Sequence, residues 1–319
     1  MDRKLPPAVQ ISPEVARALS QDQPLVALES TVITHGLPYP ENISLAEDME
    51  NEIRRWGAVP ATVAVIDGHI HVGLIMAQMQ RLVQPSPRLN KISTRDFSHV
   101  IAHSESGGTT VAGTMVAAHL VGIRVFATGG IGGVHHSLNA RQRTDFDISA
   151  DLPALANTPM VVVCAGAKAI LDLPATLEYL ETWGVPVVGY QTDEFPAFFA
   201  QSSGLKTSAR ADSPEDVAAI ALAHWSLGLK SAILVTIPPP DEVAMPIEEV
   251  NLAIGQALRE ARQRHVRGPE VTPFLLERVR RLTRGDSLRA NLGLLLNNAR
   301  LAAQIAHTLS PGGRGMLVE

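Results

Sequence analysis

The chain has very little cysteine and few aromatic residues. Cys164 is the only cysteine among 319 residues, which excludes an internal disulfide and is typical of proteins of the reducing cytoplasm. Aromatic residues make up only 4% of the chain, which argues against recognition of nucleic-acid bases by stacking on aromatic side chains. The formal net charge of −5 argues in the same way against a broad basic surface for nucleic acid.

Long apolar runs are missing as well. No uncharged run is long enough to span a membrane, and the N-terminal residues, which include Arg3 and Lys4, lack the apolar core of a signal peptide. We therefore expect a cytoplasmic protein without a membrane partner. Because hydrophobic residues make up 45% of the chain and no linker interrupts it, we expect one domain over residues 1–319, with a core from about 25 to about 305 and flexible ends.

Apolar β-branched segments alternate with helical patterns along most of the chain. Strands are predicted at residues 25–33, 61–66, 69–72, 124–128, 185–190 and 231–236. Helices are predicted at residues 44–57, 74–83, 174–183, 214–227, 246–266, 272–282 and 287–307. This alternation predicts an α/β fold with three layers, α/β/α, around a mostly parallel central sheet, followed by a helical C-terminal cap.

The most informative single charge lies in residues 161–172. The segment begins as an apolar β-branched strand, continues through Ala165, Gly166 and Ala167, and then places Lys168 alone among apolar residues. Burial disfavours the ammonium form, so an amine at this position must find a partner or lose its proton. Lys168 is therefore a candidate nucleophile. The alternative is a lysine whose stem packs while its head reaches water or a carboxylate.

Glu29 interrupts the apolar pattern of the strand predicted at residues 25–33. It is either a carboxylate that faces solvent at the end of a strand or a buried general acid that keeps its proton. In open parallel sheets, ligands bind beyond the carboxyl ends of the strands. That rule predicts that Glu29, the glycine loop at residues 129–133, Lys168 and the turn at residues 190–193 meet at one edge.

Two glycine-rich segments and one basic loop are candidates for binding phosphate. Residues 107–113 open a predicted helix with glycines and hydroxyls, a pattern typical of anion sites, although it is not a Walker loop. Residues 129–133 contain four glycines in five positions, which we expect to need positive φ or close approach to a ligand. Lys91 and Arg95 suit phosphate, but a solvated loop explains them equally well.

Carboxylates gather in residues 145–152. Asp145, Asp147 and Asp151, together with Ser149, can hold a hard divalent ion, partly through water. The same residue types are also good helix N-caps, so the pattern does not decide between the two roles.

The last predicted helix contains Asn291, Asn297 and Asn298. Asparagine is a poor helix former. We expect these side chains to face a ligand or another chain.

Four motifs in order resemble the pseudouridine-5′-phosphate glycosidase family. They are residues 27–40 (ALESTVITHGLPYP), 128–135 (TGGIGGVH), 146–152 (FDISADL) and 163–168 (VCAGAK). The resemblance implies a reversible cleavage of the C–C glycosidic bond of pseudouridine 5′-phosphate to uracil and ribose 5-phosphate, in nucleotide catabolism. It also implies an α/β/α fold, a homotrimer and a divalent metal, usually manganese.

The resemblance further implies roles for individual residues. Lys168 matches the nucleophile, Glu29 the proton donor and Asp147 the metal ligand. Implied substrate-binding residues are Lys91, Thr110, Val111, Ser149, Ala150, Asp151 and Asn291. The sequence departs from the family pattern in a longer stretch at residues 135–143, in Ile237 for an expected asparagine, and in Thr94 and Phe97.

Two other functions fit the same residues. A Schiff-base aldolase acting on sugar phosphates would use the same lysine, with Glu29 acting on a hydroxyl group instead of a carbon. A non-catalytic sugar-phosphate sensor would use the glycine loops alone. A nucleotide kinase is disfavoured because no GxxxxGK[ST] motif occurs.

Overall fold

The computed structural model of the protein describes residues 5–37, 39–83, 89–137, 146–266 and 270–310. The strands are β1 (Val9–Ile11), β2 (Leu25–Leu28), β3 (Val59–Ile66), β4 (His69–Val72), β5 (Asn90–Ile92), β6 (Gly107–Thr109), β7 (Val125–Ala127), β8 (Val134–His135), β9 (Val161–Cys164), β10 (Leu171–Asp172), β11 (Val187–Tyr190), β12 (Ala209–Ala211) and β13 (Ile233–Thr236).

The helices alternate with these strands through most of the chain. They are α1 (Pro13–Ser20), α2 (Glu41–Arg55), α3 (Met76–Val83), α4 (Phe97–Ala102), α5 (Val111–Leu120), α6 (Asp151–Asn157), α7 (Leu173–Thr182), α8 (Pro214–Ser226), α9 (Ile247–Gln263), α10 (Val271–Leu282) and α11 (Asp286–Leu309). A π-helix, η1 (Val32–Gly36), and a 3-10 helix, η2 (Thr94–Asp96), complete the described elements.

The main sheet has the order β1-β4-β3-β2-β7-β9-β13-β11-β12, and β6 joins it beside β3 with β5 as its neighbour. The pairings from β3 through β2, β7, β9, β13 and β11 to β12 are all parallel. Among the described residues, the antiparallel pairings of this sheet are those of β3 with β4 and with β6. The mostly parallel sheet predicted from the alternating pattern is therefore confirmed.

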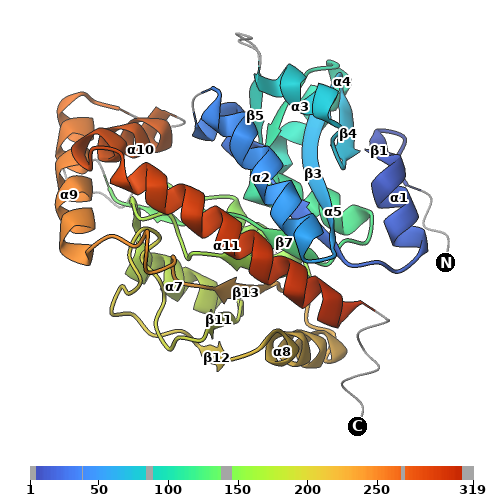
Figure 1. Cartoon of the computed structure of the whole chain (residues 1–319). Helices are drawn as coiled ribbons and strands as arrows, with labels where there is room; N and C mark the ends of the chain where they lie inside the picture. Colours follow the sequence, from blue (N-terminus) through green and yellow to red (C-terminus); the bar gives the residue numbers. More distant parts are fainter. Residues whose placement is uncertain (1–4, 38, 84–88, 138–145, 267–269, 311–319) are drawn as a thin grey trace.

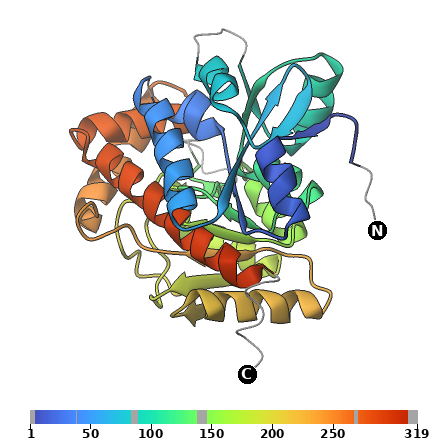
Figure 2. The same ribbon diagram turned by 45° about the vertical axis from the view of Figure 1, so that its right-hand side comes forward.

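Helices cover the sheet and give the fold its layers (Figures 1 and 2). On one side α11 lies between α2 and α8 and packs against β2, β7 and β9. A second group of helices consists of α5, α6 and α7, in which α5 contacts α6 and α6 contacts α7. The central strand β9 is fully buried, which explains its uninterrupted run of β-branched residues.

The predicted helical C-terminal region is confirmed, with one difference in its arrangement. Helices α9 and α10 pack on each other at the periphery, as expected for a cap (Figure 1). The last helix, α11, instead crosses the strands as part of a layer, because its buried face is apolar along most of its length. In the part of the chain that the structure describes, no helix is both long and apolar enough to cross a membrane.

The strand predicted at residues 25–33 is wrong in its second half. β2 ends at Leu28, and the chain turns because the Ser30 carbonyl oxygen accepts hydrogen bonds from the amides of Ile33 and Thr34, both at 3.0 Å. The Ser30 hydroxyl also donates to the Val63 carbonyl oxygen at 2.6 Å, which ties this turn to β3. A π-helix therefore begins where the predicted strand was expected to end.

Two further boundaries differ from the prediction. Helix α2 begins at Glu41 after Pro40, three residues before the predicted start at residue 44. Residues 107–109 form β6 instead of the start of a helix. A Cβ atom on Gly107 would lie 2.1 Å from the Asn90 carbonyl oxygen, so strand pairing explains this glycine.

Candidate functional site

The parallel strands bring the predicted catalytic residues to one edge of the sheet, as expected. Glu29 follows β2 directly, and Lys168 lies four residues after the end of β9. Both side chains are partly buried. Each carboxyl oxygen of Glu29 accepts a hydrogen bond from a threonine hydroxyl, one from Thr31 and one from Thr128 at the end of β7.

The glycine loop after β7 holds the backbone of Lys168. The Lys168 amide donates to the Ile131 carbonyl oxygen at 3.0 Å, and the Ile131 amide donates to the Gly166 carbonyl oxygen at 3.1 Å. Gly166 has a φ of +88°, and a Cβ atom there would lie 2.6 Å from the Pro196 carbonyl oxygen. Gly166, one of the small residues before Lys168, thus allows the backbone at Pro196 to approach closely.

Positive φ, one of the two reasons expected for the glycines at residues 129–133, is wrong. None of the four has positive φ. Protein atoms fill the space beside them: a Cβ atom on Gly132 would lie 2.2 Å from Ser149 Oγ, and one on Gly133 would lie 2.3 Å from Thr176 Oγ1. The loop is glycine-rich because neighbouring side chains pack directly on its backbone.

Lys91, on β5, lies in the same electrostatic environment as the two predicted catalytic residues. The pKa of Lys91 is lowered, first by burial of its amine and then by the positive charge of Lys168. The carboxylates of Glu29 and Asp151 act in the opposite direction. Four charged groups from distant parts of the sequence therefore converge at this edge.

Asp151 is buried and both its oxygens are already engaged. Oδ1 accepts from the Ala112 amide at 2.9 Å, and Oδ2 accepts from the Gly132 amide at 2.8 Å. It does not cap its own helix, α6, which has no side-chain cap. Instead it caps the first turn of α5 and ties that turn to the glycine loop.

The first turn of α5 has fewer free backbone amides for binding an anion than the sequence predicts. Thr110 caps this helix by accepting from the Gly113 amide at 3.3 Å, and Asp151 takes the Ala112 amide. The Val111 amide has no acceptor among the described residues. One free donor therefore remains next to Thr110.

Asp147 is exposed, and its backbone carbonyl oxygen accepts from the His135 amide at 2.9 Å. Within the described ranges, no three His, Cys, Asp or Glu side chains form a group that could hold a metal ion. Asp145, the third acidic residue of this motif, lies outside the described residues, as does most of the stretch 135–143. Asp147 is thus a single carboxylate donor facing solvent.

Two histidines at this edge were not predicted as site residues. Burial lowers the pKa of His135, and the charges of Lys168 and Lys91 lower it further, against the opposing effect of Asp147. Burial and Lys91 also lower the pKa of His35. His35 lies inside the motif at residues 27–40, and His135 ends the glycine-rich motif at residues 128–135. Their place in these motifs is the signal that could have identified them.

The three asparagines of α11 do not all behave as expected. Asn298 is buried, and its Nδ2 donates to the Thr128 carbonyl oxygen at 2.8 Å, so it faces this chain's own loop. Asn297 Nδ2 donates to the Pro238 carbonyl oxygen at 3.4 Å. Asn291 Oδ1 lies 3.5 Å from the position of a Cβ atom on Gly129, which places it beside the loop at the site edge.

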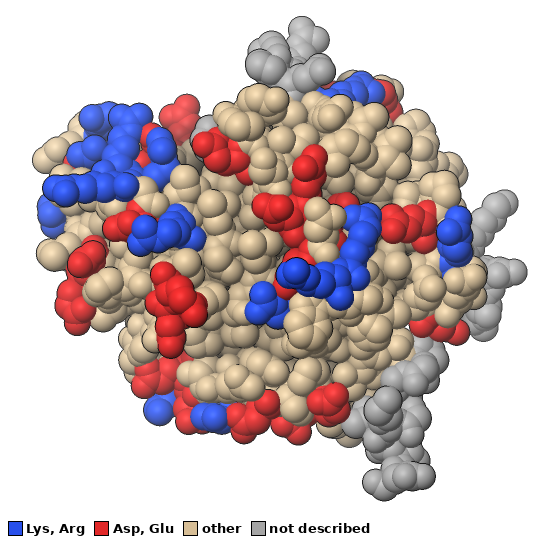
Figure 3. Space-filling view, in the orientation of Figure 1, with Lys and Arg blue, Asp and Glu red and all other residues tan. Residues whose placement is uncertain are grey.

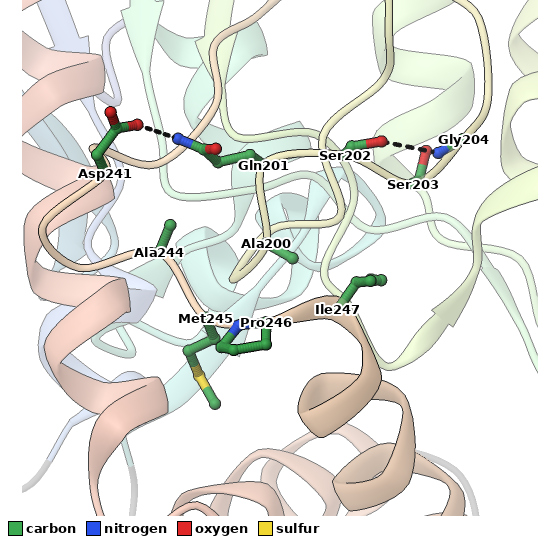
Figure 4. A pocket seen from close by; sticks show the side chains of 10 residues that line it. All are labelled: Ala200, Gln201, Ser202, Ser203, Gly204, Asp241, Ala244, Met245, Pro246 and Ile247. Carbon is green, nitrogen blue, oxygen red and sulfur yellow. Dashed lines mark hydrogen bonds between the residues drawn. The ribbon is translucent and has the colours of Figure 1, made fainter.

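A separate cavity of about 580 Å³ lies elsewhere on the molecule (Figure 4). It is lined by residues 200–204 and by Asp241 and residues 244–247, and Gln201 donates to Asp241 across one side of it. None of the predicted site residues lines this cavity. The candidate site is therefore identified by its charged residues and not by the size of a cavity.

At the carboxyl edge of the parallel sheet, two hydroxyl groups hold a carboxyl group, and two lysines lie nearby. This arrangement in an α/β fold is that of an enzyme. More specifically, the chain belongs to the family described as Indigoidine synthase A like protein, whose family model matches residues 14–308.

Similar proteins cover nearly the whole chain. Pseudouridine-5′-phosphate glycosidase of Escherichia coli (strain K12) is 51% identical over 301 residues, or 94% of this chain and 95% of that protein. Pseudouridine-5′-phosphate glycosidase 2 of Photorhabdus laumondii is 52% identical over 298 residues, 93% of this chain and 94% of that protein.

Two solved structures have the same fold. A prealnumycin C-glycosynthase in complex with ribulose 5-phosphate superposes with a TM-score of 0.88 at 38% identity, covering 97% of this chain and 99% of that chain. An indigoidine synthase A-like protein from Thermotoga maritima gives a TM-score of 0.84 at 34% identity, covering 94% and 96%.

Proposed function

We propose that the chain is a pseudouridine-5′-phosphate glycosidase, which cleaves the C–C glycosidic bond of its substrate reversibly to uracil and ribose 5-phosphate. Relatives of this name share about half of all residues over most of the chain. The observation that carries the proposal is the convergence of Lys168, Glu29 and Lys91 at one sheet edge. A solved relative holds ribulose 5-phosphate, which supports a five-carbon sugar phosphate as ligand.

The bond to be broken explains why an amine and an acid are both needed. A C–C glycosidic bond offers no oxygen or nitrogen leaving group, so protonation of a heteroatom at that bond cannot start the cleavage. The base carbon itself must accept a proton, and the sugar carbon must carry the electron deficit. A nitrogen lone pair at the sugar carbon meets the second need by forming an imine.

Lys168 and Glu29 divide these tasks. The Lys168 amine forms a C–N bond to C1′ while the C1′–O4′ bond of the ribose ring breaks, and the proton that the nitrogen loses passes to O4′. The nitrogen lone pair then forms the C=N bond while the C1′–C5 bond breaks. The Glu29 carboxyl group gives its proton to C5 of uracil. Water then hydrolyses the imine, releases ribose 5-phosphate and regenerates the amine of Lys168.

Lys91 supplies a positive charge for the phosphate. In the protein alone, burial lowers the pKa of Lys91, and the positive charge of Lys168 lowers it further. A phosphate group that binds beside Lys91 adds negative charge that offsets this repulsion, which favours binding of the dianion. The other proposed substrate-binding residues are Thr110, Val111, Ser149, Ala150, Asp151 and Asn291.

Manganese or another hard divalent cation fits the described residues only as an ion that keeps most of its water. Asp147 offers one exposed carboxylate, and hard cations bind through one or two carboxylates together with water and substrate phosphate. When bound, the ion would orient water and the phosphate group. The homotrimer, the cytoplasmic location and the single-domain organisation stay predictions from the sequence.

The test is release of free uracil from pseudouridine 5′-phosphate in the presence of manganese. We expect turnover by the wild-type protein and a loss of about 10³-fold or more in kcat for Lys168→Ala. Lys230→Ala, which removes an exposed lysine, is the matched control and should turn over normally. Absence of uracil with folded wild-type protein would contradict the proposal. Turnover of other sugar phosphates would point to an aldolase, and binding unaffected by Lys168→Ala without any turnover to a sensor.

A further inference from the structure

The carboxyl group of Glu29 is held from two sides by segments that are far apart in the sequence. Thr31 donates its hydroxyl hydrogen to Oε2, and Thr128, which is 99 residues away, donates to Oε1. Thr31 is 9% exposed and Thr128 is 1% exposed, so water has little access to either hydroxyl. Both carboxyl oxygens therefore interact with the protein before any substrate binds.

Thr128 is itself fixed by the fold. Its amide donates to the Val163 carbonyl oxygen on β9 at 3.0 Å, and its carbonyl oxygen accepts from Asn298 Nδ2 at 2.8 Å. Asn298 is fully buried on α11 and also reaches the Gly129 carbonyl oxygen at 3.4 Å. The backbone of Thr128 therefore cannot shift away from Glu29 without breaking buried hydrogen bonds, and this keeps the Thr128 hydroxyl in place.

The backbone that carries Glu29 and Thr31 is fixed in the same manner from the other side. Ser30 stands between them, and its hydroxyl donates to the Val63 carbonyl oxygen at 2.6 Å while accepting from the Thr109 amide at 2.9 Å. Thr31 begins the π-helix, where the Ser30 carbonyl oxygen accepts two amides. The two threonines thus form a rigid clamp around one carboxyl group.

We propose that Thr31 and Thr128 are positioning residues for proton transfer by Glu29, an inference that rests on the proposed function. A hydroxyl group both donates and accepts, so the clamp suits the carboxyl group with its proton and without it. During cleavage the O–H bond of Glu29 breaks, a C–H bond forms at C5 of uracil, and the negative charge stays on Glu29. Both hydroxyls then donate to that carboxylate and fix the direction of its lone pairs.

The test compares kcat and KM for uracil release by Thr128→Val and Thr31→Val with the wild type. Each valine keeps the shape of threonine and removes the hydroxyl. We expect kcat to fall about 10- to 100-fold, with KM changed less than about twofold, because the hydroxyls act on proton transfer and not on binding. Thr128→Ser, which keeps the hydroxyl, should recover most of kcat.

Thr236→Val is the matched control. Thr236 is a fully buried threonine at the end of β13, which pairs with β9 in the same sheet. Its hydroxyl donates to the Val188 carbonyl oxygen at 3.4 Å instead of to Glu29. We expect wild-type kcat for this variant. A kcat loss in Thr236→Val as large as that in Thr128→Val would show a general packing effect and overturn the inference.

A double mutant separates action through Glu29 from a structural role. In a Glu29→Gln background, Thr128→Val should lower kcat by less than about twofold, because the proton donor is already gone. A further loss of tenfold would contradict the inference, as would wild-type kcat in both valine variants. If the wild-type protein releases no uracil, the proposed function fails first, and that result is distinct from an active wild type with unaffected valine variants.

Discussion

Two regions of the molecule bring positive charges together, and they differ in whether those charges form ion pairs. On α9 and α10, at the upper left of Figure 3, arginines are paired with carboxylates on the surface: Arg278 with Glu260 at 2.6 Å, and Arg281 with Glu277 at 2.6 Å. At the sheet edge, Lys91 and Lys168 have no ion pair among the described residues and repel each other.

The difference between paired and unpaired charges helps to distinguish a surface ion pair from a residue that binds a ligand. Hydrogen bonds from Arg280 and Arg281, together with their positive charges, hold the pKa of Glu277 at about 2. The three side chains lie on neighbouring turns of one helix and are partly exposed. Such pairs need no ligand. The amine of Lys91, in contrast, is partly buried beside a second positive charge, so a bound phosphate group would supply the negative charge that it lacks.

The largest expected effect concerns the proton donor. Glu29→Gln keeps the size of the side chain and removes the acid, so kcat should fall by about 10²- to 10⁴-fold in the uracil-release assay. Glu47→Gln, which alters an exposed carboxyl group on α2, serves as the control. A kcat for Glu29→Gln within a factor of three of wild type would remove Glu29 from the chemistry.

The next effect concerns binding of the phosphate group. Lys91→Ala removes one of the two converging positive charges, and we expect KM to rise about 10- to 100-fold through loss of a charge-assisted contact. Binding of ribose 5-phosphate, measured by calorimetry, should weaken by a similar factor. Unchanged affinity would mean that phosphate binds elsewhere, for example beside Arg95.

A third effect follows from the repulsion between the lysines. Lys168→Met should raise the pKa of Lys91, which should still stay below its usual value of 10.5 because burial, the larger cause, remains. Since Lys91 binds phosphate only when charged, affinity for ribose 5-phosphate falls as pH rises through this pKa. The decline should therefore move to higher pH in the variant. NMR titration of the Lys91 side chain checks the direction, and no upward shift would contradict the proximity of the two amines.

The smallest effect is expected on the arginine surface. Glu277 has its pKa lowered to about 2, so its stabilising effect is present above the unfolded value near 4.5 and is lost as pH falls toward 2. Because the side chains are largely exposed, Glu277→Gln should cost less than about 1 kcal/mol at neutral pH. Thermal unfolding at pH 7 and at pH 2.5 checks this, and a larger loss at the lower pH would contradict the account.

Much of the fold could be predicted from local patterns. The buried run of β9 was visible as consecutive valines, and the hairpin between β3 and β4 was visible in Asp67 and Gly68, which adopt φ values of 50° and 74°. What escaped prediction depends on distant partners. The turn after Leu28 is tied to β3 by the hydrogen bond from the Ser30 hydroxyl to the Val63 carbonyl oxygen, which no local pattern encodes.

The same division holds for the site. The rule that ligands meet the carboxyl ends of parallel strands placed Glu29 and Lys168 at one edge from the sequence alone. The partners of Glu29 could not be predicted, because Thr128 becomes its neighbour only when β2 and β7 pair. The glycines of the loop were noticed, but the atom that excludes a side chain at Gly132 belongs to Ser149.

The central claim is that Lys168, and not its neighbour Lys91, forms the covalent intermediate with the sugar phosphate. Reduction with borohydride during incubation with ribose 5-phosphate, followed by peptide mass mapping, tests it directly. The account predicts a reduced sugar-phosphate adduct on the peptide that contains Lys168 and none on the peptide that contains Lys91. An adduct on Lys91 alone, or no adduct while the protein still releases uracil, would contradict it.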